Sequence, residues 1–167
     1  MDFCSCRTNV KSSLRELYLR GNYLKTIPTE ALRGMSHLTI LDLSGNQFNI
    51  IQGNVFTDIS DSLSELRLAG CGIHSISDEG FIGLGSLKTL DLSDNGLYNP
   101  PNNAFASTPL LENLHIGANN LRRIDRHDYL FLRKLKHFDL NGCNSGSLVL
   151  QVGLFRYSRT ISGFQGF

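Results

Sequence analysis

Several features that would indicate nucleic-acid binding or membrane insertion are absent from the 167-residue sequence. The formal net charge is only +1, so charge gives no reason to expect a nucleic-acid partner. The longest apolar stretch near the end, SLVLQVGLF at 147–155, is too short and too interrupted to span a bilayer. The first ten residues, MDFCSCRTNV, lack the basic start and apolar segment of a secretory leader. We therefore expect a globular, nearly neutral chain that carries no transmembrane segment and no visible signal peptide.

Catalytic and cofactor motifs are missing as well. The sequence has no glycine-rich phosphate loop, no nucleophile elbow and no paired acids at a cleft-forming position. Cys71 and His74 of the segment CGIH could in principle bind a metal, and Cys143 could act as a nucleophile, but inert buried cysteines are more common than reactive ones. The sequence predicts no enzyme activity, no cofactor and no metal site.

The strongest positive signal is an internal repeat. The pattern L-x-x-L-x-L-x-x-N recurs at spacings of 24, 25, 24, 24 and 24 residues. The leucines that open the six copies are Leu14, Leu38, Leu63, Leu87, Leu111 and Leu135. A second apolar position follows eighteen residues into each complete copy, at Leu32, Phe56, Phe81, Phe105 and Tyr129. Neither a Pro-rich linker nor a change of composition interrupts the array, so we expect one continuous repeat domain.

These motifs resemble the leucine-rich repeat family over about residues 14–143. The resemblance implies an α/β solenoid, a horseshoe-shaped arc with a parallel β-sheet on its concave side and irregular or short helical segments on its convex side. The x-L-x-L-x alternation turns the leucines to the inner face of each strand, and stacking neighbouring copies buries them. Phe56, Phe81 and Phe105 are expected to fill the convex half of the core.

The position after each strand carries a buried amide in this family, where it bonds backbone groups of the adjoining turns. Cysteine is also accepted there, because it is small, tolerates burial and has a weak S–H donor. The resemblance implies a structural ladder of Asn22, Asn46, Cys71, Asn95, Asn119 and Cys143.

A candidate binding face follows from the strand alternation. Alternate strand residues point away from the core, so the copies place one side chain per strand in a central row about 4.8 Å apart. That row contains Tyr18, Asp42, Arg67, Asp91, His115 and Asp139, and Arg20 and His137 complete the candidate face. Two interpretations are open. Either the alternating charges satisfy one another on a solvated surface, or the row, with Tyr18 as an aromatic anchor, binds a protein partner.

The ends of the chain are expected to differ from the array. Residues 1–13 resemble an incomplete N-terminal cap of extracellular leucine-rich proteins, in which Cys4 and Cys6 would favour an oxidising compartment. Residues 144–167 contain no seventh motif and no cysteine-containing cap. We therefore expect an irregular tail, an unpaired sheet edge and self-association through Leu135, Phe138 and Leu140 at that end.

The repeat length resembles the animal extracellular class, and within it the mixed Asn and Cys ladder resembles chaoptin-like cell-surface adhesion proteins. Toll-type receptors share most of this consensus, and the sequence contains no N-x-S/T glycosylation site that would support a secreted glycoprotein. A basic stretch at 122–136 is interrupted by acids and lacks stacking aromatics, so it does not favour nucleic acid. The sequence predicts an extracellular or cell-surface recognition or adhesion module that binds another protein, for example a cell-surface protein. The alternatives are an intracellular adaptor or inhibitor and a fragment of a Toll-type ectodomain.

Overall fold

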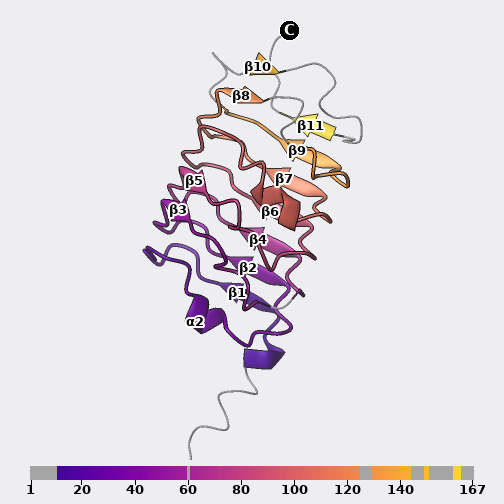
Figure 1. Cartoon of the computed structure of the whole chain (residues 1–167). Helices are drawn as coiled ribbons and strands as arrows, with labels where there is room; N and C mark the ends of the chain where they lie inside the picture. The colour runs from indigo at the N-terminus through magenta and orange to yellow at the C-terminus, as the bar shows by residue number, and fades with distance from the viewer. Residues whose placement is uncertain (1–10, 60, 125–128, 144–148, 151–159, 163–167) are drawn as a thin grey trace, which may run out of the picture.

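The fold is a stacked series of similar coils around one apolar core (Figure 1). The computed structural model describes residues 11–59, 61–124, 129–143, 149–150 and 160–162. Cys4 and Cys6, the expected N-terminal cap residues, lie outside these ranges.

One parallel sheet runs along the whole stack. Its strand order is β1-β2-β4-β6-β7-β9-β11, so each coil contributes one strand beside that of the preceding coil. The strands are β1 (Glu16–Tyr18), β2 (Ile40–Asp42), β4 (Glu65–Arg67), β6 (Thr89–Asp91), β7 (Asn113–His115), β9 (His137–Asp139) and β11 (Thr160–Ser162). The middle residue of each of the first six strands is Leu or Phe and points into the core, which confirms the predicted alternation.

Two short sheets line the opposite side of the coils. β3 (Ile50–Ile51) pairs with β5 (Ser75–Ile76), and β8 (Arg123–Ile124) pairs with β10 (Val149–Leu150). Residues 96–103 of the intervening coil are all described and form no strand. Pro100 and Pro101 stand there, and proline cannot donate a ladder hydrogen bond.

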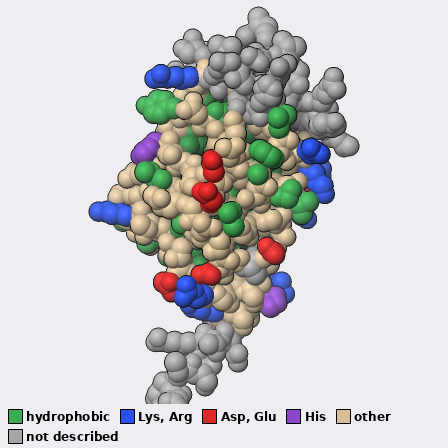
Figure 2. Space-filling view, viewed as in Figure 1, with side chains coloured by type: hydrophobic (Ala, Val, Ile, Leu, Met, Phe, Trp, Pro, Cys, Tyr) green, Lys and Arg blue, Asp and Glu red, His purple; other side chains and the backbone are tan. Residues whose placement is uncertain are grey.

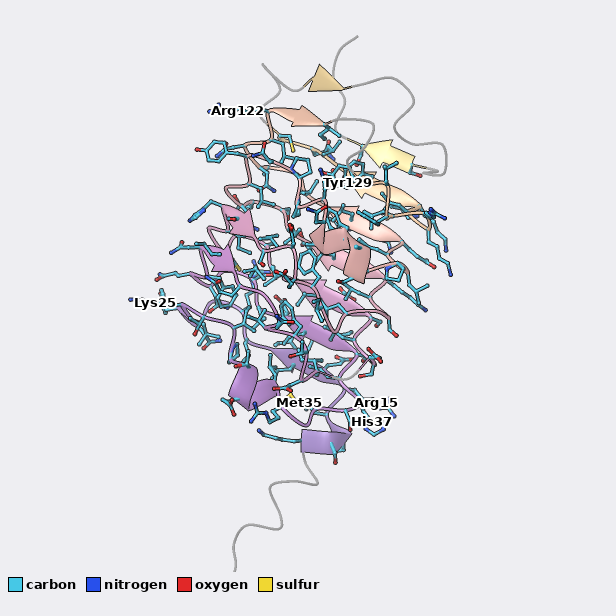
Figure 3. All side chains as sticks on the ribbon, in the orientation of Figure 1. Arg15, Lys25, Met35, His37, Arg122 and Tyr129 are labelled. Carbon is cyan, nitrogen blue, oxygen red and sulfur yellow. The ribbon has the colours of Figure 1, made fainter. Side chains whose placement is uncertain are left out.

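The returning segments are short helices and turns, as the resemblance implies. They include α2 (Thr29–Leu32) and the 3₁₀ helix η1 (Ala104–Ser107). Phe56, Phe81 and Phe105 are fully buried, which confirms their predicted place in the core. Phe81 and Phe105 stack at 6.0 Å between ring centroids, and Phe105 lies 5.5 Å from the ring of Tyr129. Tyr129 is buried within the upper part of the stack in Figure 3, and its ring meets Phe138 edge-on at 4.9 Å.

The C-terminal region requires a correction. The sheet was expected to stop at the sixth coil, but β11 pairs in parallel with β9 through Ile161 opposite Phe138. Leu135, Phe138 and Leu140 are only 3%, 1% and 1% exposed, so they do not supply the apolar surface on which the expected self-association rests. Phe138 and Ile161 are 23 residues apart, and no L-x-x-L motif precedes Ile161. The leucine pattern therefore did not predict β11. The other residues of 144–167 lie outside the described ranges.

Candidate protein-binding face

The strand register brings the central row together on the concave sheet. Tyr18 lies opposite Asp42, and Asp42 opposite Arg67. Asp91 and His115 continue the row, which reaches Asp139 on β9. Adjacent strands are parallel and unshifted, so these side chains form a single line across the face.

The aspartates of this row are held by their own strands. Asp42 Oδ1 accepts the Ser44 amide at 2.9 Å, and Asp91 Oδ1 accepts the Ser93 amide at 2.9 Å. Asp139 Oδ1 accepts the Asn141 amide at 2.9 Å. Each carboxylate therefore accepts the backbone N–H two residues later, just after its strand ends. Asp readily forms this local turn. Asp42 is only 5% exposed, so its role in the face is structural.

At Asp139, burial and hydrogen bonding shift the pKa of the carboxyl in opposite directions. Burial is the largest single effect and raises the pKa of its carboxyl, but hydrogen bonds from Asn141 and Ser162 and the interaction with nearby His115 together outweigh burial and lower the pKa. Ser162 Oγ donates to Asp139 Oδ1 at 3.0 Å from the neighbouring strand β11. His115 Nδ1 lies 3.7 Å from Asp139 Oδ2. The carboxylate thus joins β7, β9 and β11.

Arg67 is held by two acids, one on its own strand and one on the preceding strand. Its Nε donates to Glu65 Oε1 at 2.6 Å, and its Nη1 lies 3.8 Å from Asp42 Oδ2. The hydrogen bond to Glu65 is the main cause of the raised pKa of Arg67. Glu65 is not among the predicted candidate residues, although its position two residues before Arg67 puts both side chains on one face of β4. Much of the central row is therefore satisfied internally, as the first of the two interpretations requires.

Exposed groups remain at both ends of the face. Near the N-terminal end Tyr18 is 55% exposed, and its hydroxyl donates to Glu16 Oε2 at 2.9 Å. That hydrogen bond is the main cause of the raised pKa of Tyr18. Arg20 is exposed beside it. Toward the other end the side chain of His115 is 42% exposed, and His137 on β9 is also exposed.

A row of small residues forms the floor between these groups. Two positions after the central-row residue of β2, β4, β6 and β7, the chain has Ser44, Ala69, Ser93 and Gly117. A Cβ atom on Gly117 would lie only 2.4 Å from the Asn141 carbonyl oxygen, so a side chain cannot be added there without moving the backbone. Small side chains leave the taller Tyr18, Arg67 and His115 standing above the sheet.

The amide ladder lies behind the strand ends. Asn95 Oδ1 accepts the amides of Cys71 at 3.0 Å and Ile73 at 2.9 Å, and its Nδ2 donates to the carbonyls of Leu68 and Leu92. Asn46 and Asn119 are buried with corresponding bonds. All of these groups would be unpaired in a buried turn without the amide.

The two cysteines of the ladder are free and buried. Cys71 Sγ donates to the Leu43 carbonyl at 3.3 Å, and Cys143 Sγ to the Ile116 carbonyl at 3.5 Å. Burial is the main cause of the raised pKa of both thiols, which opposes thiolate chemistry.

Asn22 corrects the expected ladder. It is exposed, and among the described residues its Nδ2 donates to the nearby Arg20 carbonyl at 3.2 Å. The amide of the next coil, Asn46, instead accepts the backbone N–H of Asn22. Each ladder amide bonds the coil before it, and Asn22 belongs to the first coil of the array.

Among the described residues, no group of His, Cys, Asp and Glu side chains is arranged to hold a metal ion. No helix in the described part of the chain is long and apolar enough to cross a membrane. In the view of Figure 2, hydrophobic side chains are scattered over the surface rather than gathered into one large patch.

Comparison with known proteins agrees with the repeat geometry. A family profile described as leucine rich repeat matches residues 12–61 and 61–116. The chain belongs to the leucine-rich repeat family. No curated protein sequence matches it.

Solved leucine-rich repeat structures resemble this chain closely in fold. A TLR13–ssRNA13 complex aligns with a TM-score of 0.76 and 26% identity, covering 93% of this chain and 22% of that one. Drosophila Toll, in its glycosylated complex with Spatzle, aligns with a TM-score of 0.79 and 21% identity, covering 89% of this chain and 20% of that one. A second Toll–Spatzle structure aligns with a TM-score of 0.73 and 20% identity, covering 80% of this chain and 18% of that one. This leucine-rich repeat chain therefore spans about a fifth of each neighbour's length.

Proposed function

We propose that this leucine-rich repeat chain is a recognition or cell-adhesion module of an extracellular or cell-surface protein, and that its concave sheet binds a protein partner. The proposal is supported by the arrangement of exposed side chains on the concave face. Exposed Tyr18 and Arg20 at one end and His115 and His137 near the other flank a floor of small residues. Tyrosine and arginine are among the residue types that most often dominate protein–protein binding energy.

The charges favour a protein partner over a nucleic acid. One structural neighbour is a complex with single-stranded RNA and another is a complex with Spatzle, so the fold alone serves both kinds of partner. The central row of this chain carries Asp42, Asp91 and Asp139, and the net charge is only +1. Phosphate backbones are bound by clusters of Lys and Arg, and carboxylates in the middle of the face oppose them.

An extracellular origin is supported by the resemblance to chaoptin-like adhesion proteins and by the likeness in fold to Toll ectodomains. Non-reducing mass analysis of material from a secretory host tests it. Oxidised Cys4 and Cys6 are expected for the extracellular module, whereas free thiols would favour the intracellular adaptor.

Bead adhesion tests the binding face. Beads coated with the chain should adhere to cells that display the partner, and mild protease treatment of those cells should abolish adhesion, whereas nuclease treatment should not. The double variant Tyr18→Ala/Arg20→Ala should weaken adhesion, because it removes the exposed aromatic and cation from the face.

Tyr23→Ala/Lys25→Ala is the matched control, since it also removes an exposed tyrosine and an exposed cation two residues apart. Lys25 projects from the opposite side of the coils, as Figure 3 shows. Equal adhesion by both variants, or loss of adhesion after nuclease treatment, would refute the proposed partner and face.

A further inference from the structure

A second surface of the molecule has the features of a peptide site, and it does not depend on the concave face. It lies where the two short sheets on the other side of the coils are interrupted (Figure 1). β3 and β5 form one pair, β8 and β10 form another, and the coil between them provides no strand.

The interruption follows from two prolines in register with the missing strand. In the preceding coils the Ser77 amide donates to the Ile51 carbonyl at 3.0 Å. One repeat later, 24 residues on, the corresponding donor to the Ile76 carbonyl would be residue 101. That residue is Pro101, which has no N–H, so it cannot continue the ladder along β5.

A hollow lies between β5 and residues 97–103 of the next coil. The Asn102 amide donates back to the Pro100 carbonyl at 2.9 Å, which closes a tight turn. A cavity of about 410 Å³ opens between β5 and this turn, within the range of roughly 300–1,000 Å³ typical of ligand pockets. Its lining includes Ser75 and Ile76 of β5 together with His74, Asp78, Tyr98 and Asn103.

The charge in the hollow is negative and fixed in place. Asn103 Nδ2 donates to Asp78 Oδ2 at 3.1 Å, which orients the carboxylate without neutralising it. No ion pair to Asp78 forms among the residues that the structure describes. Asp78 is the only Asp, Glu, Lys or Arg of the lining.

The ring of Tyr98, which lines the hollow, already contacts a cation. The guanidinium carbon of Arg122 lies 5.3 Å from the centre of the Tyr98 ring, and Figure 3 shows Arg122 beside β8, at the far end of the interruption. Tyr98 is 49% exposed, so the ring also offers surface to a ligand.

We propose that this hollow binds a short extended peptide segment that carries a Lys or Arg. The segment adds to the open edge of β5, as extended peptides add to exposed sheet edges in other recognition proteins. Its backbone N–H donates to the Ile76 carbonyl, the position that Pro101 cannot fill, and its basic side chain meets the Asp78 carboxylate. The partner is thus defined by an extended backbone and one positive charge.

The experiment titrates the ¹⁵N-labelled chain with acetyl-Val-Arg-Val-Thr-Val-amide and follows amide chemical shifts. The expected shifts are confined to residues 74–78 and 97–103. Replacing the peptide's Arg by Glu should weaken binding about tenfold or more, the loss expected for a charge-assisted hydrogen bond. N-methylation of the peptide bond before the third residue removes a ladder donor and should also weaken binding.

Two protein variants test the same contacts. Asp78→Asn keeps the shape of the side chain and removes its charge, so it should weaken the Arg peptide and leave the corresponding Gln peptide unchanged. Asp94→Asn is the matched control, because Asp94 is exposed and lies outside the lining. Equal affinity for the Arg and Glu peptides, shifts confined to the concave strands, or no binding by any peptide would overturn the proposal. None of these outcomes bears on adhesion through Tyr18 and Arg20, so the two proposals fail separately.

Discussion

Individual residues of this chain are most constrained where they satisfy buried backbone groups. Asn95 bonds five backbone groups in two successive coils through one side chain. Cys71 occupies the equivalent position in the preceding coil and contributes Sγ–H donation over 3.3 Å to one carbonyl and a longer contact to a second. The same ladder position therefore carries very different amounts of hydrogen bonding.

We expect Asn95→Ala to lower the free energy of unfolding more than Cys71→Ala. The first change leaves buried amides and carbonyls unpaired at about 1–3 kcal/mol for each group that water does not reach. The second removes mainly packing and a weak donor. Urea titrations with unchanged slope provide the comparison, and equal midpoints for the two variants would contradict the assigned roles.

A glycine between two coils gives a second residue-scale prediction. Gly83 has φ +96°, and a Cβ there would lie 2.4 Å from the Phe56 carbonyl oxygen. Gly83→Ala should therefore destabilise the fold by more than about 1–3 kcal/mol, since strain in the backbone adds to the clash. Gly85→Ala is the control, because a Cβ there has only Asp61 Oδ1 at 4.0 Å. Thermal unfolding of both variants measures the difference, and a similar loss in both would refute the close approach at Gly83.

Asp139 predicts a dependence of stability on pH. Its folded pKa is lowered, so the stabilisation is present above the unfolded value of about 3.9 and is lost as the pH falls through the folded pKa. Asp139→Asn should thus be less stable than the natural chain at pH 7, and the difference should shrink below about pH 4. Urea midpoints at several pH values test this, with the exposed Asp61→Asn as control. A difference that grows on acidification would have the wrong sign.

At the scale of elements, the repeat pattern predicted the strands well and the irregular parts poorly. The leucines fix which strand face is buried, because a shift by one residue would expose the whole set. The sequence therefore predicted the strand register and the central row correctly. It missed β11, whose coil lacks the leucine start, and it included Asn22 in the ladder although the amide contacts run toward the preceding coil. Contacts of individual side chains, such as Arg67 with Glu65, depend on rotamers that no repeat pattern specifies.

The aromatic stack that joins the coils gives a prediction at the same scale. Phe105 is fully buried between the rings of Phe81 and Tyr129. Phe105→Ala should cost about 3–5 kcal/mol, because it removes a large core side chain and leaves a cavity between neighbouring coils. Phe131→Ala, at a position that is 47% exposed, should cost far less. Urea denaturation of the two variants measures the difference in unfolding free energy. Comparable losses of unfolding free energy would mean that the aromatic stack does not couple the coils.

At the scale of the whole molecule, each coil contacts mainly its neighbours, so the fold is an approximately linear array. One side presents the concave sheet with Tyr18, Arg67 and His115, and the other presents the interrupted short sheets with the Asp78 hollow. The sequence predicted the first surface through the strand alternation. It did not predict the second, because the hollow arises from two prolines that break a ladder visible only in three dimensions.

Site-specific photo-crosslinking shows directly whether the concave face contacts a protein partner. The photoreactive residue p-benzoylphenylalanine replaces Tyr18 on the concave face or Tyr23, which is 77% exposed, as the control. Chains bound to adhering cells are irradiated, and the crosslinked product is measured with and without excess unlabelled chain. Our account predicts a protease-sensitive, competable crosslink from position 18 and little from position 23. Equal crosslinking from the two positions, or none from position 18 while adhesion persists, would contradict it.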